Sequence, residues 1–386
     1  CCTVSGIISS RIRSIFYISY VYRGEGVGGG MAVNGRHKNV TISDVARAAG
    51  VSKTTVSRYI NGKYSLMSPE TRERIAAVIE MSHYRPSSIA QSLKAKQSYQ
   101  IGVVVADVSS PFSAALIRGI GHVLLENNYV ALFADSKNSL ELEQRLIQTL
   151  VSRKVDGLIV NTNSYYNPSL IQLACQGMPV VLCDRQVSDY NFPLVGSEQR
   201  QPILDVVAHL KEEGFHTAAF FTEEYAANSA RFTRRNAFLE AMAFHYPDQD
   251  AQSLSFTVDI SDQAGTIRAI EQLLGRCGSG NTPAIIGVNN VTTMHVVGAI
   301  RAMGLEIPRQ VGICGPNDWG WDEQINWPVI VPPGITTFTV QSYEIGCTVA
   351  QVLLQRIQNP AAEKQEIRLP SELVVRGSTR LRAARV

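Results

Sequence analysis

Residues 52–58 combine hydrogen-bond donors with the spacing of a helix, a pattern that suits contact with nucleic acid. Ser52 stands at a cap position, and Val56 and Ile60 recur at the spacing of one apolar helix face. The side chains that such a helix turns outward are donors: Lys53, Thr54, Ser57 and Arg58. Lysine and arginine donate to guanine edges, and hydroxyls donate to phosphate oxygens. A lone cationic face is more often solvated surface, so the neighbouring elements decide between the two interpretations.

Two further helices are predicted around this one. The first follows a cap at Thr41, with Asp44 three residues later, and ends at Gly50. The connection between these two helices is only a few residues long and includes Gly50, which is the spacing of a helix-turn-helix. A serine–proline pair at positions 68 and 69 predicts the third helix. We therefore expect an all-α headpiece of about 50 residues whose second helix enters the major groove of DNA.

The distribution of charge supports this interpretation. Residues 31–96 hold eleven Lys and Arg against four Asp and Glu, whereas residues 97–386 hold 22 against 28. A compact basic module on an acidic body is typical of a nucleic-acid binder with a second activity elsewhere.

The composition excludes several other classes of protein. A chain of 386 residues that is 45% hydrophobic and 18% charged suits two or three folded domains. The seven cysteines lack C-x-x-C spacing and the seven histidines lack metal-ligand spacing, so no metal and no cofactor are expected. No apolar run approaches the ~20 residues of a membrane helix. No nucleophile elbow or phosphate loop is present, so we expect no enzyme activity. Reduced cysteines and the lack of an export signal predict a cytoplasmic protein.

The first 30 residues are interpreted separately. The chain begins with Cys1, and residues 24–30 read GEGVGGG immediately before Met31. A translated purine-rich ribosome-binding site would give such a stretch. We therefore expect residues 1–30 to be a non-native upstream extension without a function. The glycines of this stretch are not expected to form a dinucleotide-binding loop, because no strand precedes them and no helix follows them.

From residue 99 onward the pattern changes to alternating strands and helices. Short apolar runs predict buried parallel strands at 101–105, 129–134, 157–160, 180–183, 218–221, 285–288 and 311–314. Helical segments are predicted between them at 114–126, 140–152, 234–244, 263–274 and 291–303. Repeated βα units indicate a doubly wound α/β core, which binds ligands at the carboxyl ends of its strands. Candidate site residues therefore follow the strands, at 107–112, 161–163, 184–185, 289–290 and 316–319.

Two stretches resemble the LacI/GalR family of bacterial regulators. They are TISDVARAAGVSKTTVSRYING (41–62) and YRPSSIAQSLK (84–94), and the resemblance extends to about residue 376. It implies that Lys53, Thr54 and Arg58 read bases. It also implies phosphate-contacting or helix-anchoring roles for Thr41, Ser52, Thr55, Ser57 and Asn61. Leu93, in the hinge, would wedge into the minor groove as one of a dimer pair, although an ordinary packing role is the alternative.

For the rest of the chain the resemblance implies a periplasmic-binding-protein-like (type I) core with two lobes that close over a small molecule. Arg234, four residues before Phe238, matches the family's effector arginine, although Ala237 replaces the usual glycine. The sequence GPNDWGW (315–321) resembles the ketogluconate-responsive branch. The effector-binding residues expected on this basis are Ser110, Phe112, Asp184, Arg185, Arg234, Asn290, Asp318 and Trp319.

The class of effector follows from one departure from the family pattern. After the 285–288 strand the family usually has Asn-Asp, whereas this chain has Asn289 and Asn290. A carboxylate there would repel an anion, while an amide can donate to it, and Arg185 and Arg234 remain to bind a carboxylate. We therefore favour a ketogluconate-like sugar acid over a neutral sugar, which stays the alternative.

The expected organisation has four parts. They are the extension at 1–30, the headpiece at 31–84, a hinge at 85–98 and the effector-binding and dimerisation core at 99–386. Lobe 1 is expected at about 99–193 and 320–333, and lobe 2 at about 194–319 and 334–376. The expected partners are double-stranded operator DNA and a sugar or sugar-acid effector. The chain is expected to form a homodimer or a dimer of dimers and not to bind a membrane. A stand-alone sugar-binding protein is the remaining alternative, but it would need an export signal and no headpiece. The sequence leaves the operator, the exact effector and the choice between induction and co-repression open.

Overall fold

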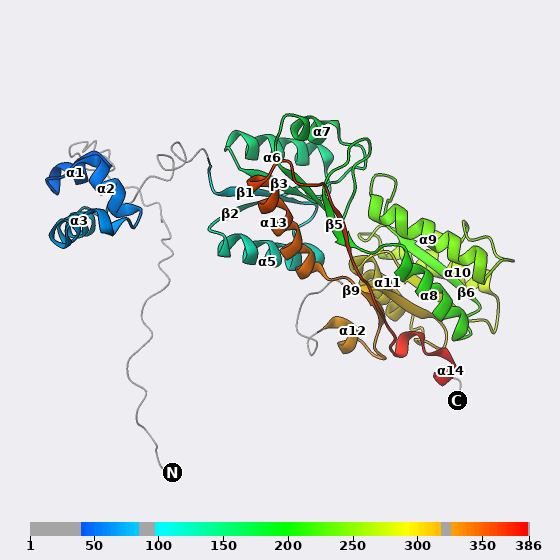
Figure 1. The fold of residues 1–386 in the computed structure, drawn as a ribbon. Helices are drawn as coiled ribbons and strands as arrows, with labels where there is room; N and C mark the ends of the chain where they lie inside the picture. Colours follow the sequence, from blue (N-terminus) through cyan, green and yellow to red (C-terminus); the bar gives the residue numbers. More distant parts are fainter. Residues whose placement is uncertain (1–39, 85–96, 318–325, 385–386) are drawn as a thin grey trace, which may run out of the picture. The chain divides into compact units, whose positions relative to one another are not determined.

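The computed structural model describes residues 40–84, 97–317 and 326–384. Its contacts divide the chain into two units, Cys1–Pro86 and Ser87–Val386 (Figure 1). The expected extension at 1–30, Leu93 and most of the expected hinge lie outside the described residues, as do Asp318 and Trp319.

The first unit contains the three predicted helices and one 3₁₀ turn. They are α1 (Ile42–Ala48), α2 (Lys53–Ile60), η1 (Tyr64–Leu66) and α3 (Pro69–Ser82). Thr41 and Asp44 form a reciprocal capping box at α1, and the Ser52 hydroxyl accepts from the backbone N–H of Thr55 at the start of α2. Gly50 and Gly62 adopt the left-handed conformation after α1 and α2, which glycine reaches without strain. The sequence signals therefore locate these helices correctly.

A small apolar cluster holds the three helices together. Its buried members come from all of them: Val45, Ala46, Ala49, Val56 and Ile75. Ile60, Val78 and Ile79 pack against this cluster while partly exposed. Because α2 packs only the face that carries Val56 against this cluster, its opposite face is free to contact a partner.

The second unit contains two sheets whose strands are almost all parallel. The first runs β11-β5-β4-β3-β1-β2 and the second β12-β10-β9-β8-β6-β7. The strands of the first are β1 (Gln100–Val105), β2 (Val130–Asp135), β3 (Gly157–Val160), β4 (Val180–Cys183), β5 (Leu194–Ser197) and β11 (Glu366–Leu369). Those of the second are β6 (Thr217–Thr222), β7 (Ser255–Thr257), β8 (Pro283–Gly287), β9 (Gly312–Asn317), β10 (Thr336–Thr339) and β12 (Leu373–Val374). All pairings are parallel except that of β10 with β12. The doubly wound α/β prediction is confirmed.

Helices cover both sheets. The first lobe consists of its sheet with α5 (Pro111–Glu126), α6 (Leu140–Ser152), α7 (Pro168–Cys175) and α13 (Ser342–Gln358). The second consists of its sheet with α8 (Gln201–Glu212), α9 (Ser229–His245), α10 (Gln263–Cys277) and α11 (Asn290–Ala302). The short elements α12 (Trp327–Ile330), η3 (Gly377–Thr379) and α14 (Leu381–Ala384) complete the chain. In the first lobe, α5 and α13 bury one face of the sheet, while α6 and α7 bury the other (Figure 1).

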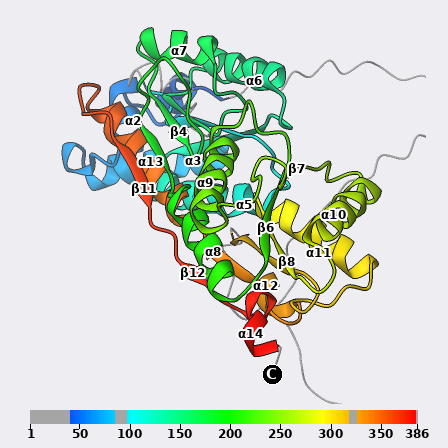
Figure 2. The ribbon, with the colours of Figure 1, turned by 90° about the vertical axis from the view of Figure 1, so that its right-hand side faces the viewer.

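The division between the lobes differs from the expected one in the last third of the chain. The chain enters the second lobe after β5, returns to the first after β10, and crosses once more between β11 and β12 (Figure 2). Consequently α13 and β11, within the expected second lobe, belong to the first, where Val349 and Leu353 join its core. Trp327, expected in the first lobe, packs in the core of the second.

Membrane spans and metal-binding clusters are both absent from the described part of the chain. No helix there is long and apolar enough to cross a membrane. No group of three or more His, Cys, Asp and Glu side chains there could hold a metal ion.

Candidate functional site

A polar cavity opens where the carboxyl ends of the strands of both lobes meet. It has a volume of about 120 Å³, below the ~300–1,000 Å³ of pockets for drug-sized ligands, so it suits a compact metabolite. Its wall contains three carboxylates and three guanidiniums, those of Asp107, Asp184, Glu223, Arg185, Arg231 and Arg234. Phe112, Ile260 and Val340 supply apolar surface beside these charges.

The backbone after β4 is held in a conformation that aims Asp184 at the cavity. Asp184 has φ 63°, in the left-handed region that a residue other than glycine seldom adopts. Its N–H donates to the carbonyl of Val195, and its Oδ1 accepts from Nε2 of Gln199 at 2.9 Å. A Cβ added at Gly196 would lie 3.1 Å from the Asp184 Cα. The neighbouring strand therefore leaves little room for the loop to relax, which keeps this carboxylate in place.

Arg185 contacts neutral oxygen atoms. Its Nη1 donates to the carbonyl of Thr162 at 3.1 Å and to Oδ1 of Asn163 at 3.4 Å. Among the described residues no carboxylate forms an ion pair with Arg185. Burial lowers its pKa, while the negative charge of Asp184 opposes that shift. An arginine remains cationic in spite of such a shift, so the cavity contains a desolvated positive charge.

The buried carboxyl group of Glu143 organises the loop beneath Arg185. Glu143 is fully buried on α6 and accepts from the Thr162 hydroxyl, the Asn163 N–H and the Asn167 amide at 2.6–2.9 Å. Burial raises its pKa, and these hydrogen bonds oppose the rise. Glu143 thus fixes the segment whose oxygens orient Arg185.

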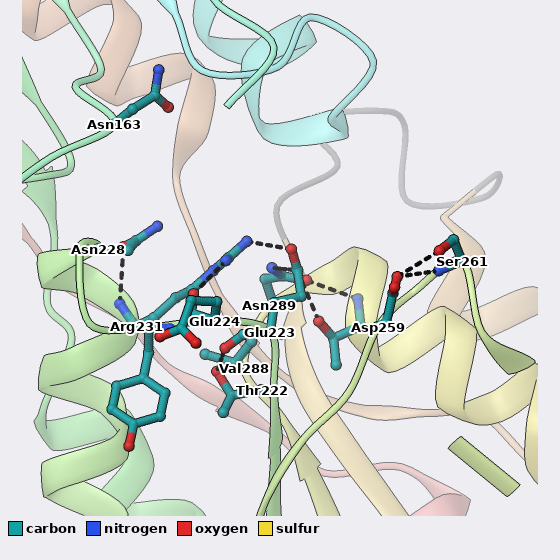
Figure 3. A network of polar contacts seen from close by, with 12 residues as sticks. Asn163, Thr222, Glu223, Glu224, Asn228, Arg231, Asp259, Ser261, Val288 and Asn289 are labelled. Atoms are coloured by element: carbon teal, nitrogen blue, oxygen red, sulfur yellow. Dashed lines mark hydrogen bonds and ion pairs between the residues drawn. The ribbon is translucent and has the colours of Figure 1, made fainter. Parts of the chain in front are cut away.

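Across the cavity, Arg231 of α9 is paired with Glu223, which directly follows β6 (Figure 3). Their Nη2 and Oε2 atoms are 2.5 Å apart, and both side chains are about four-fifths buried, with 17% and 20% exposed. The other oxygen of Glu223 accepts from the Asn289 amide at 2.6 Å and from the Thr292 hydroxyl at 3.1 Å. Arg234, one turn further along α9, donates to the carbonyl of Val288 at 2.6 Å.

The cavity brings together five of the eight residues expected to bind an effector. They are Ser110, Phe112, Asp184, Arg185 and Arg234. Asn290 does not line it: this residue is 1% exposed in the first turn of α11, and its neighbour Asn289 takes the cavity position instead. Asn289 caps α11 through its Oδ1, which orients its amide nitrogen toward Glu223.

Sequence reasoning missed Glu223, Asn228 and Arg231. Two signals could have found them. Glu223 is the second residue after the predicted strand at 218–221, so the rule that selected Asp184 also applies to it. Asn228 is the cap of α9, so Arg231 lies in the first turn, whereas the predicted helix begins only at Arg234.

In the headpiece, the residues predicted to contact DNA fall into two groups. Thr41, Ser52, Thr55, Ser57 and Asn61 all take part in hydrogen bonds that cap α1 or α2 or close the end of α2. Lys53, Thr54 and Arg58 are exposed on α2, and within the described residues no hydrogen bond or ion pair occupies their side chains. The first group shapes the helix-turn-helix, and the second group is available to a partner.

The comparisons with known proteins agree with both units. Residues 41–87 match the model for bacterial regulatory proteins of the lacI family, and residues 207–379 match a periplasmic binding protein-like domain. The chain is 32% identical to the HTH-type transcriptional regulator KdgR of Bacillus subtilis, over 88% of this chain and 98% of the relative. It is also 32% identical to the HTH-type transcriptional regulator PtxS of Pseudomonas plecoglossicida, over 89% of this chain and 96% of the relative.

Solved structures share the fold. The lac repressor dimer bound to operator and the anti-inducer ONPF aligns with a TM-score of 0.73 at 23% identity, over 89% of this chain and 99% of that one. The complex of the transcriptional regulator CelR with cellobiose aligns with a TM-score of 0.63 at 23% identity, over 88% and 99%.

The chain combines a helix-turn-helix headpiece with a two-lobed core that contains a polar cavity. These features define the class of DNA-binding regulators that respond to a ligand. The chain belongs to the LacI family of bacterial transcriptional regulators. Its sequence relatives are transcriptional regulators and not enzymes.

Proposed function

We propose that this regulator is a repressor whose affinity for operator DNA is controlled by a ketogluconate-like sugar acid bound in the cavity between the lobes. The effector carboxylate pairs with Arg185, and its hydroxyls bind to Asp107, Asp184 and Asn289. Closure of the lobes over the effector changes the geometry that the core imposes on the hinge, and operator affinity falls. The protein acts as a homodimer in the cytoplasm, with two headpieces on a near-palindromic site.

The observation that carries the sugar-acid assignment is the state of Arg185. Among the described residues this partly buried guanidinium donates only to neutral oxygens and forms no ion pair, so it has lost hydration without a direct counter-ion. A planar carboxylate can accept two parallel hydrogen bonds from such a group. An anionic effector therefore gains more from this site than a neutral sugar of the same shape.

A neutral sugar is the second candidate, and the same cavity supports it. Asp107, Asp184 and Glu223 also line the wall, and carboxylates are good acceptors for sugar hydroxyls. The three negative charges equal the three positive ones, so the net charge of the wall does not separate the two candidates. Arg185 has no ion-pair partner in the part of the chain that the structure describes, and this favours the acid.

A matched pair of ligands separates the candidates. 2-Keto-D-gluconate and D-fructose differ at one carbon, which is a carboxylate in the first and a hydroxymethyl group in the second. We expect 2-keto-D-gluconate to raise the unfolding temperature of the core, because a ligand at 100 times its Kd stabilises by about 2.7 kcal/mol. Fructose should give a much smaller shift. An equal or larger response to fructose would reject the sugar acid.

A pair of variants assigns the effect to Arg185. Arg185→Gln should remove the response to 2-keto-D-gluconate and leave any response to fructose. Arg145→Gln is the matched control, since it removes an exposed guanidinium of α6 that is paired with Glu141. If Arg185→Gln responds to the acid as the wild type does, the carboxylate binds elsewhere.

A further inference from the structure

The carboxylate of Glu223 is bound by the protein in the way that a receptor binds a carboxylate ligand. One oxygen accepts from the Arg231 guanidinium at 2.5 Å, and the other accepts from the Asn289 amide and the Thr292 hydroxyl at 2.6 and 3.1 Å. The donors come from α9, from the residue that caps α11 and from α11 itself. A guanidinium, an amide and a hydroxyl that converge on one carboxylate form a complete set of partners for an anion.

Two of the three donors, Arg231 and Asn289, face the effector cavity, whereas Thr292 is fully buried. Glu223, Arg231 and Asn289 all line the cavity, and Figure 3 shows their side chains directed toward one another. The ion pair is about four-fifths buried, so its Coulomb attraction is screened less than that of a surface pair. It therefore differs from the exposed pairs elsewhere in the chain, which contribute little.

Arg231 and Arg185 belong to one electrostatic site. The positive charge of Arg231 adds to burial in lowering the pKa of Arg185, and the negative charge of Glu223 opposes that effect. The negative charge of Glu223 thus partly offsets the positive charges of two neighbouring guanidiniums. A second carboxylate between these two guanidiniums would accept from both of them, and it would compete with Glu223 for Arg231.

We infer that Glu223 is an internal competitor of the effector: its carboxylate occupies the Arg231 side of the anion site, and the carboxylate of a bound sugar acid displaces it. This inference rests on the proposed function, since it assumes an anionic effector. The ion pair then sets specificity. A neutral sugar has no carboxylate to take the place of Glu223 beside Arg231. The Glu223–Arg231 ion pair therefore excludes neutral sugars from this side of the cavity.

The competing interpretation is that Glu223 accepts hydrogen bonds from sugar hydroxyls. The two interpretations predict opposite effects of Glu223→Gln. A competitor that loses its charge releases Arg231, and the acid binds more tightly. An acceptor that becomes an amide binds hydroxyls less well, so both the acid and its neutral analogue bind more weakly.

The test is calorimetric titration of the full-length protein with 2-keto-D-gluconate and with D-fructose. We expect Glu223→Gln to bind the acid about tenfold more tightly than the wild type, because the effector no longer has to break a charge-assisted hydrogen bond. Binding of fructose should not improve. Unchanged or weaker binding of the acid by Glu223→Gln overturns the inference.

Two further variants keep the result interpretable. The double variant Glu223→Gln, Arg231→Gln removes both charges and should lose the gain, because the gain requires the released guanidinium. Glu240→Gln is the matched control, since it removes one exposed carboxylate of α9 that is paired with Arg200 and changes the net charge equally. A gain of similar size in Glu240→Gln, or in the double variant, also overturns the inference.

The failure of the proposed function is visible separately, in the wild type. A wild-type protein that binds fructose and not the acid rejects the sugar-acid effector, and with it the inference. A wild-type protein that binds the acid while Glu223→Gln shows no gain leaves the proposed function intact and removes only the role of Glu223.

Discussion

At the scale of single residues, His209 of α8 couples the stability of the second lobe to pH. Its Nε2 lies 2.8 Å from the hydroxyl of Thr379 in η3. Burial lowers its pKa, the carboxylates of Glu213 and Glu212 oppose this shift, and Arg380 reinforces it. The folded protein therefore binds this proton less tightly than the unfolded chain does. Its contribution to stability is present above the ordinary histidine pKa of about 6.5 and is lost as the pH falls through the lowered value.

We therefore expect His209→Gln to reduce the loss of unfolding free energy between pH 7.5 and pH 5.5. The amide of glutamine can keep a hydrogen bond to Thr379 and does not titrate. Urea unfolding at the two pH values measures the difference. His122→Gln, at an exposed position of α5, controls for the loss of a histidine. An equal drop in stability for the wild type and His209→Gln would contradict this assignment.

Also at this scale, the rule that ligands bind after parallel strands found Ser110, Asp184 and Arg185, because those strands are continuous apolar runs that are easily recognised. It could not reveal that Glu223 and Arg231 form an ion pair, because their contact depends on how β6 and α9 are packed. The choice of Asn290 over Asn289 failed for a related reason: the capping geometry of α11 decides which of the two side chains faces the cavity.

At the scale of elements, α5 and α13 approach so closely that their backbones are in contact at two glycines. A Cβ on Gly119 would lie 2.1 Å from the carbonyl oxygen of Tyr343, and one on Gly346 would lie 2.3 Å from that of Leu116. Backbone atoms cannot move aside as a flexible side chain can. The contact fastens α13 to the first lobe although the chain reaches this helix from the second.

Gly346→Ala should consequently destabilise the protein, by about 1–3 kcal/mol if the helices can separate slightly and by more if they cannot. Gly298→Ala is the matched control in α11, where an added Cβ meets nothing within 4 Å. There the higher helix propensity of alanine should give a neutral or slightly stabilising change. Thermal unfolding compares the two variants, and equal stability would contradict the close packing of α5 on α13.

At the same scale, α2 is the element that we expect to read operator DNA. Arg58 is exposed near its end, while Val56 anchors the opposite face in the headpiece core. We expect Arg58→Ala to cost about 1–3 kcal/mol in operator binding and to reduce the preference over random duplex. Arg74→Ala removes the same charge from an exposed position of α3 and should preserve that preference. Electrophoretic mobility shift with competitor DNA measures both, and full selectivity in Arg58→Ala would contradict the role of α2.

The sequence predicts the positions of helices and strands wherever capping residues or long apolar runs mark their ends. Thr41, Ser52 and the pair at 68–69 located the headpiece helices, and β3, β4 and α6 have the predicted bounds. It was less informative about which lobe an element joins. No residue of α13 marks in the sequence which sheet it covers, and the three crossings between lobes are a property of the assembled core.

At the scale of the whole molecule, the two units have to be coupled for regulation. Binding in the core changes operator affinity only if the effector favours one geometry of the core and DNA favours another. The coupling is reciprocal, so operator DNA should weaken effector binding by the same factor. Only the full chain, with its headpiece, hinge and core, can test this property.

The most direct measurement is fluorescence anisotropy of a labelled duplex that the full-length protein has selected from a random library. The protein is titrated into this duplex at fixed salt under three conditions: without ligand, in the presence of 2-keto-D-gluconate and in the presence of D-fructose. We predict preferential binding over random competitor DNA and a loss of affinity of about 5–150-fold with the acid alone. Binding without preference for any duplex, or an operator affinity that neither compound changes, would contradict a repressor controlled from this cavity.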